Sequence, residues 1–146
     1  MKIFVINRFL LCGFIGWSME CFWTGLCSIL NQEDALLPCK TSVWMFPIYG
    51  FAMFIGPLSK RLRNKHWLIR GIIYALCIFF IEFCSGIILG YYHVRPWNYS
   101  HVKYQLKGVI RLDYTPLWFC VGLLFEQILK ECRRWSSLRI MFKHTN

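Results

Sequence analysis

Four acidic residues lie within or at the edges of stretches that are otherwise apolar: Glu20, Glu82, Asp113 and Glu126. An ionised carboxylate near the centre of a lipid bilayer costs on the order of 3 kcal/mol even on the lenient insertion scale. Each such group must therefore be protonated, paired with a partner, or exposed to a wet cavity. Acids in this position are typical of proton relays, ion pathways and buried polar networks. They are the residues in this sequence whose types and positions indicate chemistry.

Glu20 and Glu82 are the most informative pair. They lie in the first and third apolar stretches, which run in the same direction if every stretch crosses the membrane. Each lies a little over halfway toward the outer side, so we expect the two carboxylates to contact one another or a common partner. Two alternatives remain open. The pair shares a proton, as proton-coupled sites do, or Arg111 or Tyr99 neutralises or hydrogen-bonds one acid in a structural network.

Membrane-spanning helices must position these acids. The chain has 146 residues, of which 57% are hydrophobic and 16% charged, and its mean hydropathy of +0.43 is unusual for a soluble domain. A spanning helix needs about 20 mainly apolar residues, and four stretches qualify or come close: 3–30, 43–59, 67–92 and 108–129. We therefore predict an all-α integral membrane bundle of about four transmembrane helices. Asp113 and Glu126, near opposite ends of the fourth stretch, are expected to reach the interfaces.

Four spans with their connections occupy nearly the whole chain. We expect one transmembrane domain over residues 1–129 and a basic cytoplasmic tail over residues 130–146. No room remains for a soluble catalytic domain, and no nucleophile with an adjacent base is visible, so we do not expect an enzyme. The basic start of the first stretch resembles a signal peptide, but no small-residue cleavage site follows it. We expect an uncleaved first span.

The net charge of +10 is divided between the two sides of the predicted membrane. Twelve of the 17 basic residues fall on one side: Lys2, Arg8, Lys60, Arg61, Arg63, Lys65, Arg70, Lys130, Arg133, Arg134, Arg139 and Lys143. By the positive-inside rule, both termini and the "SKRLRNK" turn (59–65) are cytoplasmic, and the first and third connections face outward. The pattern predicts a multi-pass protein of the cell membrane, with the lipid bilayer as its surroundings and no nucleic-acid partner.

The outer connection between the third and fourth stretches, "YYHVRPWNYSHVKYQLK" (91–107), is rich in aromatic residues. Such rings settle at the level of the lipid headgroups, so the connection could be an aromatic belt segment. Alternatively it is a lid over a pocket, with Arg95, Lys103 and Arg111 attracting an anionic headgroup or substrate. The candidate polar residues of this region are Trp97, Asn98, Tyr99, Ser100 and Arg111.

Glycines and a proline pair indicate how the helices pack. The "GIILG" segment (86–90) has the small-xxx-small spacing that lets another helix approach, most often within one chain. Gly56 and Pro57 are expected to stop or kink the second helix. The glycines assigned to helix packing are Gly16, Gly50, Gly86, Gly90 and Gly108. The eight cysteines show no metal-binding spacing, so we predict no metal site and no cofactor.

Several of these residues together carry a resemblance to a known family. Taken in order, they are "GWSME" (Gly16, Trp17, Glu20), "FPIYG" (Phe46, Pro47, Tyr49, Gly50), "EFCSG" (Glu82, Gly86), "WNYS" (Trp97, Tyr99, Ser100), Gly108 and Trp118. The sequence resembles the CmpB-type family of small multi-span membrane proteins called "Putative ABC-transporter type IV". The resemblance covers roughly residues 13 to 125 and leaves the basic C-terminal tail outside it.

The resemblance implies a permease component of a transporter. This sequence has no phosphate-binding G-x-x-x-x-G-K-[ST] motif, so an ATP-driven role requires a separate ATPase subunit, which could dock on the "SKRLRNK" turn. Four spans are few for a transport path, so a homo-oligomer is the other expected assembly. The alternative is a non-transporting interaction or regulatory module. Asn98 departs from the Trp-Asp-Tyr-Ser usual in the family, and an amide carries no charge or proton at neutral pH.

Overall fold

The structure, a computed structural model, describes residues 2–30 and 36–144, with side chains for 6–30 and 36–135. Glu33, Asp34 and the side chains of Lys2, Arg139 and Lys143 lie outside the described residues. The fold is mainly helical, as predicted. Its elements are α1 (Lys2–Leu30), α2 (Met45–Gly50), η1 (Phe51–Phe54), α3 (Ile55–Arg61), α4 (Trp67–Tyr91), β1 (Gln105–Leu106), β2 (Ile110–Arg111), η2 (Leu112–Tyr114) and α5 (Thr115–His144).

Two helices within the described ranges are long and apolar enough to cross a membrane. They are residues 6–30 of α1 and the whole of α4, residues 67–91, and each spans 25 residues. At 1.5 Å per residue, such a helix covers the hydrocarbon core of about 30 Å with some tilt. Their bounds agree closely with the first and third predicted stretches, because long uninterrupted apolar runs are the strongest signal that a sequence contains.

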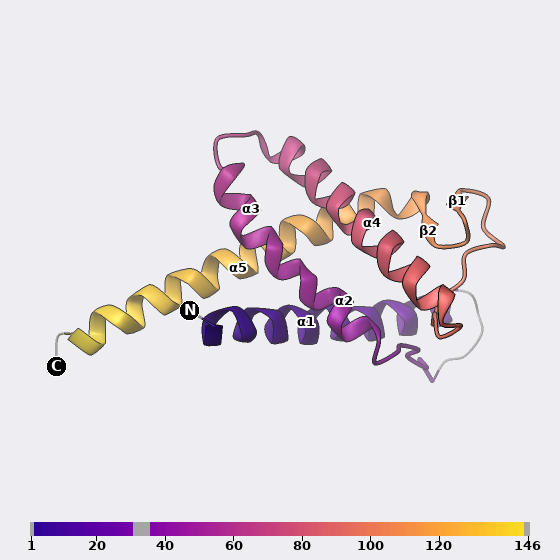
Figure 1. The fold of residues 1–146 in the computed structure, drawn as a ribbon, viewed down its shortest axis with the longest axis horizontal. Coiled ribbons are helices and arrows are strands. Elements are labelled where there is room, and N and C mark those ends of the chain that lie inside the picture. Colours follow the sequence, from indigo (N-terminus) through magenta and orange to yellow (C-terminus); the bar gives the residue numbers. More distant parts are fainter. Residues whose placement is uncertain (1, 31–35, 145–146) are drawn as a thin grey trace.

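The second predicted helix is interrupted. α2, the 3₁₀ turn η1 and α3 follow one another without a gap from residue 45 to residue 61 (Figure 1). Pro47 lies in the first turn of α2, where a missing N–H costs little. The expectation that Gly56 and Pro57 stop or kink the helix is wrong in position: the irregular turn precedes them, and α3 continues to Arg61. Pro57 has no N–H to donate to the carbonyl of Met53, four residues earlier. Met53 lies in η1, so the tightened 3₁₀ turn coincides with the missing hydrogen bond.

The fourth helix begins seven residues later than predicted. Residues 105–111 form a small antiparallel hairpin, β1 and β2, in which Leu106 pairs with Ile110, and η2 follows it. The backbone φ of Lys107 is 52° and that of Gly108 is 66°, and the Val109 N–H donates to the carbonyl of Leu106. Positive φ at two successive residues is what a tight hairpin turn requires and a helix forbids. At its other end α5 continues through residue 130 to His144, so the expected boundary at 129/130 coincides with no end of secondary structure.

The helices pack as two close pairs, α1 with α2 and α4 with α5, and α3 lies against α5. Small residues allow the close approach: a Cβ on Gly71 would meet the ring of Phe119, and one on Gly122 would meet Tyr74. Between the pairs lies an apolar core: Cys12, Ile55, Tyr74, Val121, Phe125 and Leu129. Figure 1 shows the start of α1, the end of α5 and the α3–α4 connection toward the left, and the other two connections toward the right. The two connections predicted to face outward therefore lie together.

Candidate functional site

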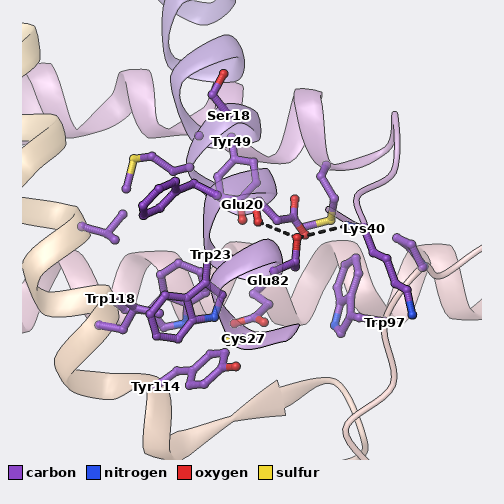
Figure 2. Close-up of a pocket in the computed structure, with 18 of the residues that line it drawn as sticks. Ser18, Glu20, Trp23, Cys27, Lys40, Tyr49, Glu82, Trp97, Tyr114 and Trp118 are labelled. Carbon is purple, nitrogen blue, oxygen red and sulfur yellow. Dashed lines mark hydrogen bonds between the residues drawn. The ribbon is translucent and has the colours of Figure 1, made fainter. Parts of the chain in front are cut away.

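One cavity of about 690 Å³ brings Glu20 and Glu82 together. α1 contributes Glu20 to its wall and α4 contributes Glu82, while α2, α5 and both of the predicted outer connections complete it (Figure 2). Tyr49 of α2 also lines the cavity. Two carboxylates and a half-buried tyrosine thus share one space of the size that small-molecule sites have.

Glu20 is held at the rim of this cavity by the first connection. The Thr41 Oγ1 hydroxyl donates to Glu20 Oε2 at 2.9 Å. One turn further along α1, Thr24 Oγ1 accepts a hydrogen bond from the Lys40 backbone N–H at 3.1 Å and donates to the Glu20 carbonyl at 3.0 Å. These bonds attach residues 40 and 41 to the outer end of α1. The Glu20 carboxylate is therefore oriented by a hydroxyl donor.

Glu82 has a different environment, although it lines the same cavity. It lies in α4, the more apolar of the two helices of membrane-spanning length, and is 8% exposed. The Trp118 indole lies close to it. Within the described part of the chain, neither Glu82 Oε2 nor Trp118 Nε1 completes a hydrogen bond. Since buried polar atoms in folded proteins are nearly always paired, this carboxylate oxygen is open to a further partner.

Aromatic rings line the rest of the cavity, and Tyr114 connects them. Its ring centroid lies 6.2 Å from that of Trp23, 6.3 Å from that of Tyr99 and 6.3 Å from that of Trp118, all in edge-to-face geometry. Trp97 completes the lining beyond Glu82 (Figure 2). We call Trp23, Tyr99, Tyr114 and Trp118 the aromatic wall. Trp23 and Tyr114 were not among the predicted site residues, because their roles depend on the folding of the α4–α5 connection.

The connection between α4 and α5 is folded, and its Trp97 and Tyr99 line the cavity. The Trp97 indole donates to the Val109 carbonyl at 2.9 Å, and the Tyr99 N–H donates to the Gly108 carbonyl at 2.9 Å. Asn98 Oδ1 accepts from the backbone N–H and the hydroxyl of Ser100, at 3.0 and 2.6 Å. Asn98 and Ser100 thus shape a turn and do not line the cavity. An aspartate at this position would accept the same two hydrogen bonds. The turn therefore does not depend on whether residue 98 is asparagine or aspartate.

Arg111 pairs with its neighbour Asp113 and not with either cavity acid. Its guanidinium donates to both Asp113 oxygens at 2.9 to 3.0 Å and to the Tyr114 hydroxyl at 3.2 Å. This pairing raises the pKa of Arg111 and lowers the pKa of Asp113. The alternative in which Arg111 neutralises Glu20 or Glu82 is therefore wrong. The other bases of this connection, Arg95 and Lys103, do not line the cavity either.

Glu126 is a second buried acid, which we had expected to reach an interface. That expectation is wrong, because its side chain is fully buried. Lys130 lies 2.7 Å from Oε1, one turn along α5, and Arg70 of α4 lies 3.5 Å from Oε2. The i,i+4 spacing of Glu126 and Lys130 is visible in the sequence, whereas the contact with Arg70 requires the tertiary fold. This ion cluster joins α4 to α5 outside the cavity.

Four of the five predicted packing glycines lie in close contacts. A Cβ on Gly16 would meet Tyr49, one on Gly50 would meet Phe9, and one on Gly86 would meet Val109. Gly108 is held against Ser100 with its positive φ. Gly90 differs, since the nearest atom to its Cβ position is Arg95 Nη1 at 3.9 Å. Gly13, Gly71 and Gly122 lie in comparably close contacts and were not predicted, because no sequence pattern marks them.

Fold and site together define a class: a helical protein with two membrane-length apolar helices and an acid-lined aromatic cavity between its helices. Comparison with known families identifies it further. The profile of the family "Putative ABC-transporter type IV" matches residues 7–144, so the chain belongs to this family. The match extends beyond residue 125, and the expectation that the basic C-terminal segment lies outside the family is wrong. No solved structure matches the chain.

Proposed function

We propose that this protein is the membrane subunit of a transporter and that the cavity around Glu82 is its solute-binding site. In this proposal the chain is a multi-pass protein of the cell membrane with four spans. Both termini and the α3–α4 connection are cytoplasmic, and the cavity opens to the outside. Family membership supports a transport role, and the excess of basic residues at the termini and in residues 59–65 supports the orientation.

The observation that carries the proposal is the environment of Glu82. A carboxylate in the middle of an apolar helix needs a partner or water, and here it faces a cavity that residues from four helices and two connections enclose. A purely structural acid would be expected to resemble Glu126, which two basic side chains hold. The contrast between the two buried acids of one fold favours a binding role for Glu82.

An ATP-driven role requires a separate subunit, since this sequence contains no phosphate-binding motif for ATP. We propose a separate ATPase subunit that docks on the basic α3–α4 connection. Arg63 and Lys65 there are exposed, as a docking surface requires. Catalysis by this chain is not part of the proposal.

The test is gentle extraction of the tagged protein from its own membrane, followed by quantitative mass spectrometry of the proteins that copurify. We expect an ATPase in a fixed ratio to the chain. Charge reversal in the docking segment, Arg63→Glu with Lys65→Glu, should remove it. The matched outer variant, Lys103→Glu with Lys107→Glu, should retain it. Recovery of the chain with only copies of itself would overturn the proposal.

A non-transporting interaction module is the second candidate, and the ion cluster favours it. Arg70, Glu126 and Lys130 hold α4 to α5, and Arg133 donates to the Gly56 carbonyl of α3 at 3.1 Å. Polar groups that only join helices would give a rigid scaffold for another membrane protein. The same purification distinguishes the two, since a scaffold would recover a membrane partner without an ATPase.

A further inference from the structure

We propose that the cavity binds a monovalent organic cation of the substituted-ammonium class, with the aromatic wall around it and Glu82 as its counter-ion. This inference rests on the proposed solute-binding function and deepens it by naming the class of solute. It stands on three observations: the aromatic rings of the lining, the charge of the lining, and the poor fit of anions and metal ions to the described cavity.

Tryptophan and tyrosine rings make up much of the cavity lining. The aromatic wall takes its members from α1, the α4–α5 connection, η2 and α5, and Tyr49 and Trp97 also line the cavity. The ring faces of tryptophan and tyrosine attract cations electrostatically, tryptophan most strongly, and cages of such rings recognise substituted ammonium groups. The Arg111 guanidinium already lies 4.4 Å from the Tyr114 ring centroid, so the rings left for a bound cation are chiefly those of Trp23, Tyr99 and Trp118.

The charge of the lining matches one positive charge. Glu20 and Glu82 contribute two carboxylates, and Lys40 is the one basic residue among the described residues that line the cavity. Lys40 is exposed, and its backbone is attached to α1 through Thr24. With both acids ionised, the lining therefore has one excess negative charge. The Thr41 hydroxyl holds Glu20, whereas Glu82 Oε2 has no hydrogen-bond partner among the described residues, so Glu82 is the acid that a bound cation would pair with.

Other ligand classes fit less well. An anionic headgroup would meet two carboxylates, and the bases expected to attract it, Arg95, Lys103 and Arg111, are not in the lining. A hard metal ion needs six or more oxygen ligands, and the described residues contain no group of three or more His, Cys, Asp or Glu side chains placed to hold one. The volume of about 690 Å³ suits a small organic molecule.

The test is calorimetric titration of the purified full-length protein with choline and with 3,3-dimethylbutan-1-ol, which has a carbon atom in place of the quaternary nitrogen. We expect choline to bind and the neutral isostere to bind about tenfold more weakly or not at all. Glu82→Gln and, separately, Trp118→Leu should each weaken choline binding by about tenfold. The matched controls Glu131→Gln and Trp135→Leu should leave it unchanged, because both side chains are exposed outside the cavity.

The ammonium group could belong to a free solute or to a lipid headgroup, and two lipid compositions distinguish these sources. In discs of phosphatidylglycerol, which has no ammonium group, choline should bind whether the natural ligand is a free solute or a lipid headgroup. In discs of phosphatidylcholine, unchanged affinity indicates a free solute, and weaker apparent affinity through competition indicates the headgroup.

Three results would overturn the inference: no choline binding by the wild-type protein, equal binding of the neutral isostere, or unchanged binding by both folded variants. Copurification of the ATPase would be unaffected by any of these results. The inference can therefore fail while the proposed function stands.

Discussion

Glu82 and Glu126 show how two buried acids in neighbouring helices can serve different ends. Glu126 is held by Arg70 and Lys130, so its charge is compensated within the protein. Glu82 lies at the wall of a cavity that Trp118 also lines, and none of the basic side chains that the structure describes is paired with it. Removing the charge should therefore have opposite effects on stability at the two positions.

We predict that Glu82→Gln leaves the thermal midpoint of the detergent-solubilised protein unchanged or raises it, because a buried acid without a basic partner among the described residues is replaced by a neutral group of the same shape. Glu126→Gln should lower the stability by about 3 kcal/mol, because Arg70 loses its buried partner. Thermal unfolding of both variants under identical conditions checks this. A greater loss of stability in Glu82→Gln than in Glu126→Gln would show that Glu82 is the structural acid.

The sequence indicated part of the site at this scale. Four predicted site residues line the cavity: Glu20, Glu82, Trp97 and Tyr99. They could be predicted because an acid within an apolar stretch and an aromatic-rich connection can both be recognised in a single sequence. Arg111 was assigned to the wrong partner, since its bond to Asp113 depends on a local turn. Trp23 and Tyr114 meet only through tertiary folding, which no spacing along the chain reveals.

At the scale of elements, the same hydropathy that located α1 and α4 misplaced the start of α5. Residues 108–114 are apolar enough to extend the fourth helix. They instead form the end of the hairpin turn, the strand β2 and the 3₁₀ turn η2. Hydropathy measures burial and does not distinguish a buried helix from a short buried strand. Val109 and Ile110 are indeed buried. The hairpin in turn places Tyr99 and Tyr114 at the cavity.

Gly86 and Gly90 offer a matched test of element packing, since both belong to α4 and to one small-xxx-small pattern. Gly86→Ala should destabilise the protein by about 1 to 3 kcal/mol, because the new methyl group would overlap Val109 and press on Trp97. Gly90→Ala should be neutral or slightly stabilising, because its Cβ position is open and alanine favours helix. Thermal unfolding and the yield of monodisperse protein measure both. Equal effects at the two positions would contradict the packing of α4 against the hairpin.

At the scale of the whole molecule, the described parts of the two connections predicted to face outward lie toward the same end (Figure 1), and residues of both line the cavity. The positive-inside pattern predicted which segments share a side, and the spatial arrangement agrees with that grouping (Figure 1). The number of spans that cross the bilayer stays a prediction for the interrupted α2–η1–α3 segment and for α5. The central claim is that the cavity lies within the membrane region and is wet from the outer side.

Cys27 tests this claim most directly, because it lines the cavity and is half-buried. Intact cells are treated with a membrane-impermeant thiol reagent, and labelling at each cysteine is measured by mass spectrometry. Exposed Cys39 in the first connection is the outer control, and Arg63→Cys provides the inner one. We predict fast labelling of Cys39, slower labelling of Cys27, and no labelling at position 63 until the membrane is opened. If Cys39 were labelled while Cys27 stayed inert, or if position 63 were labelled from outside, the account would be contradicted.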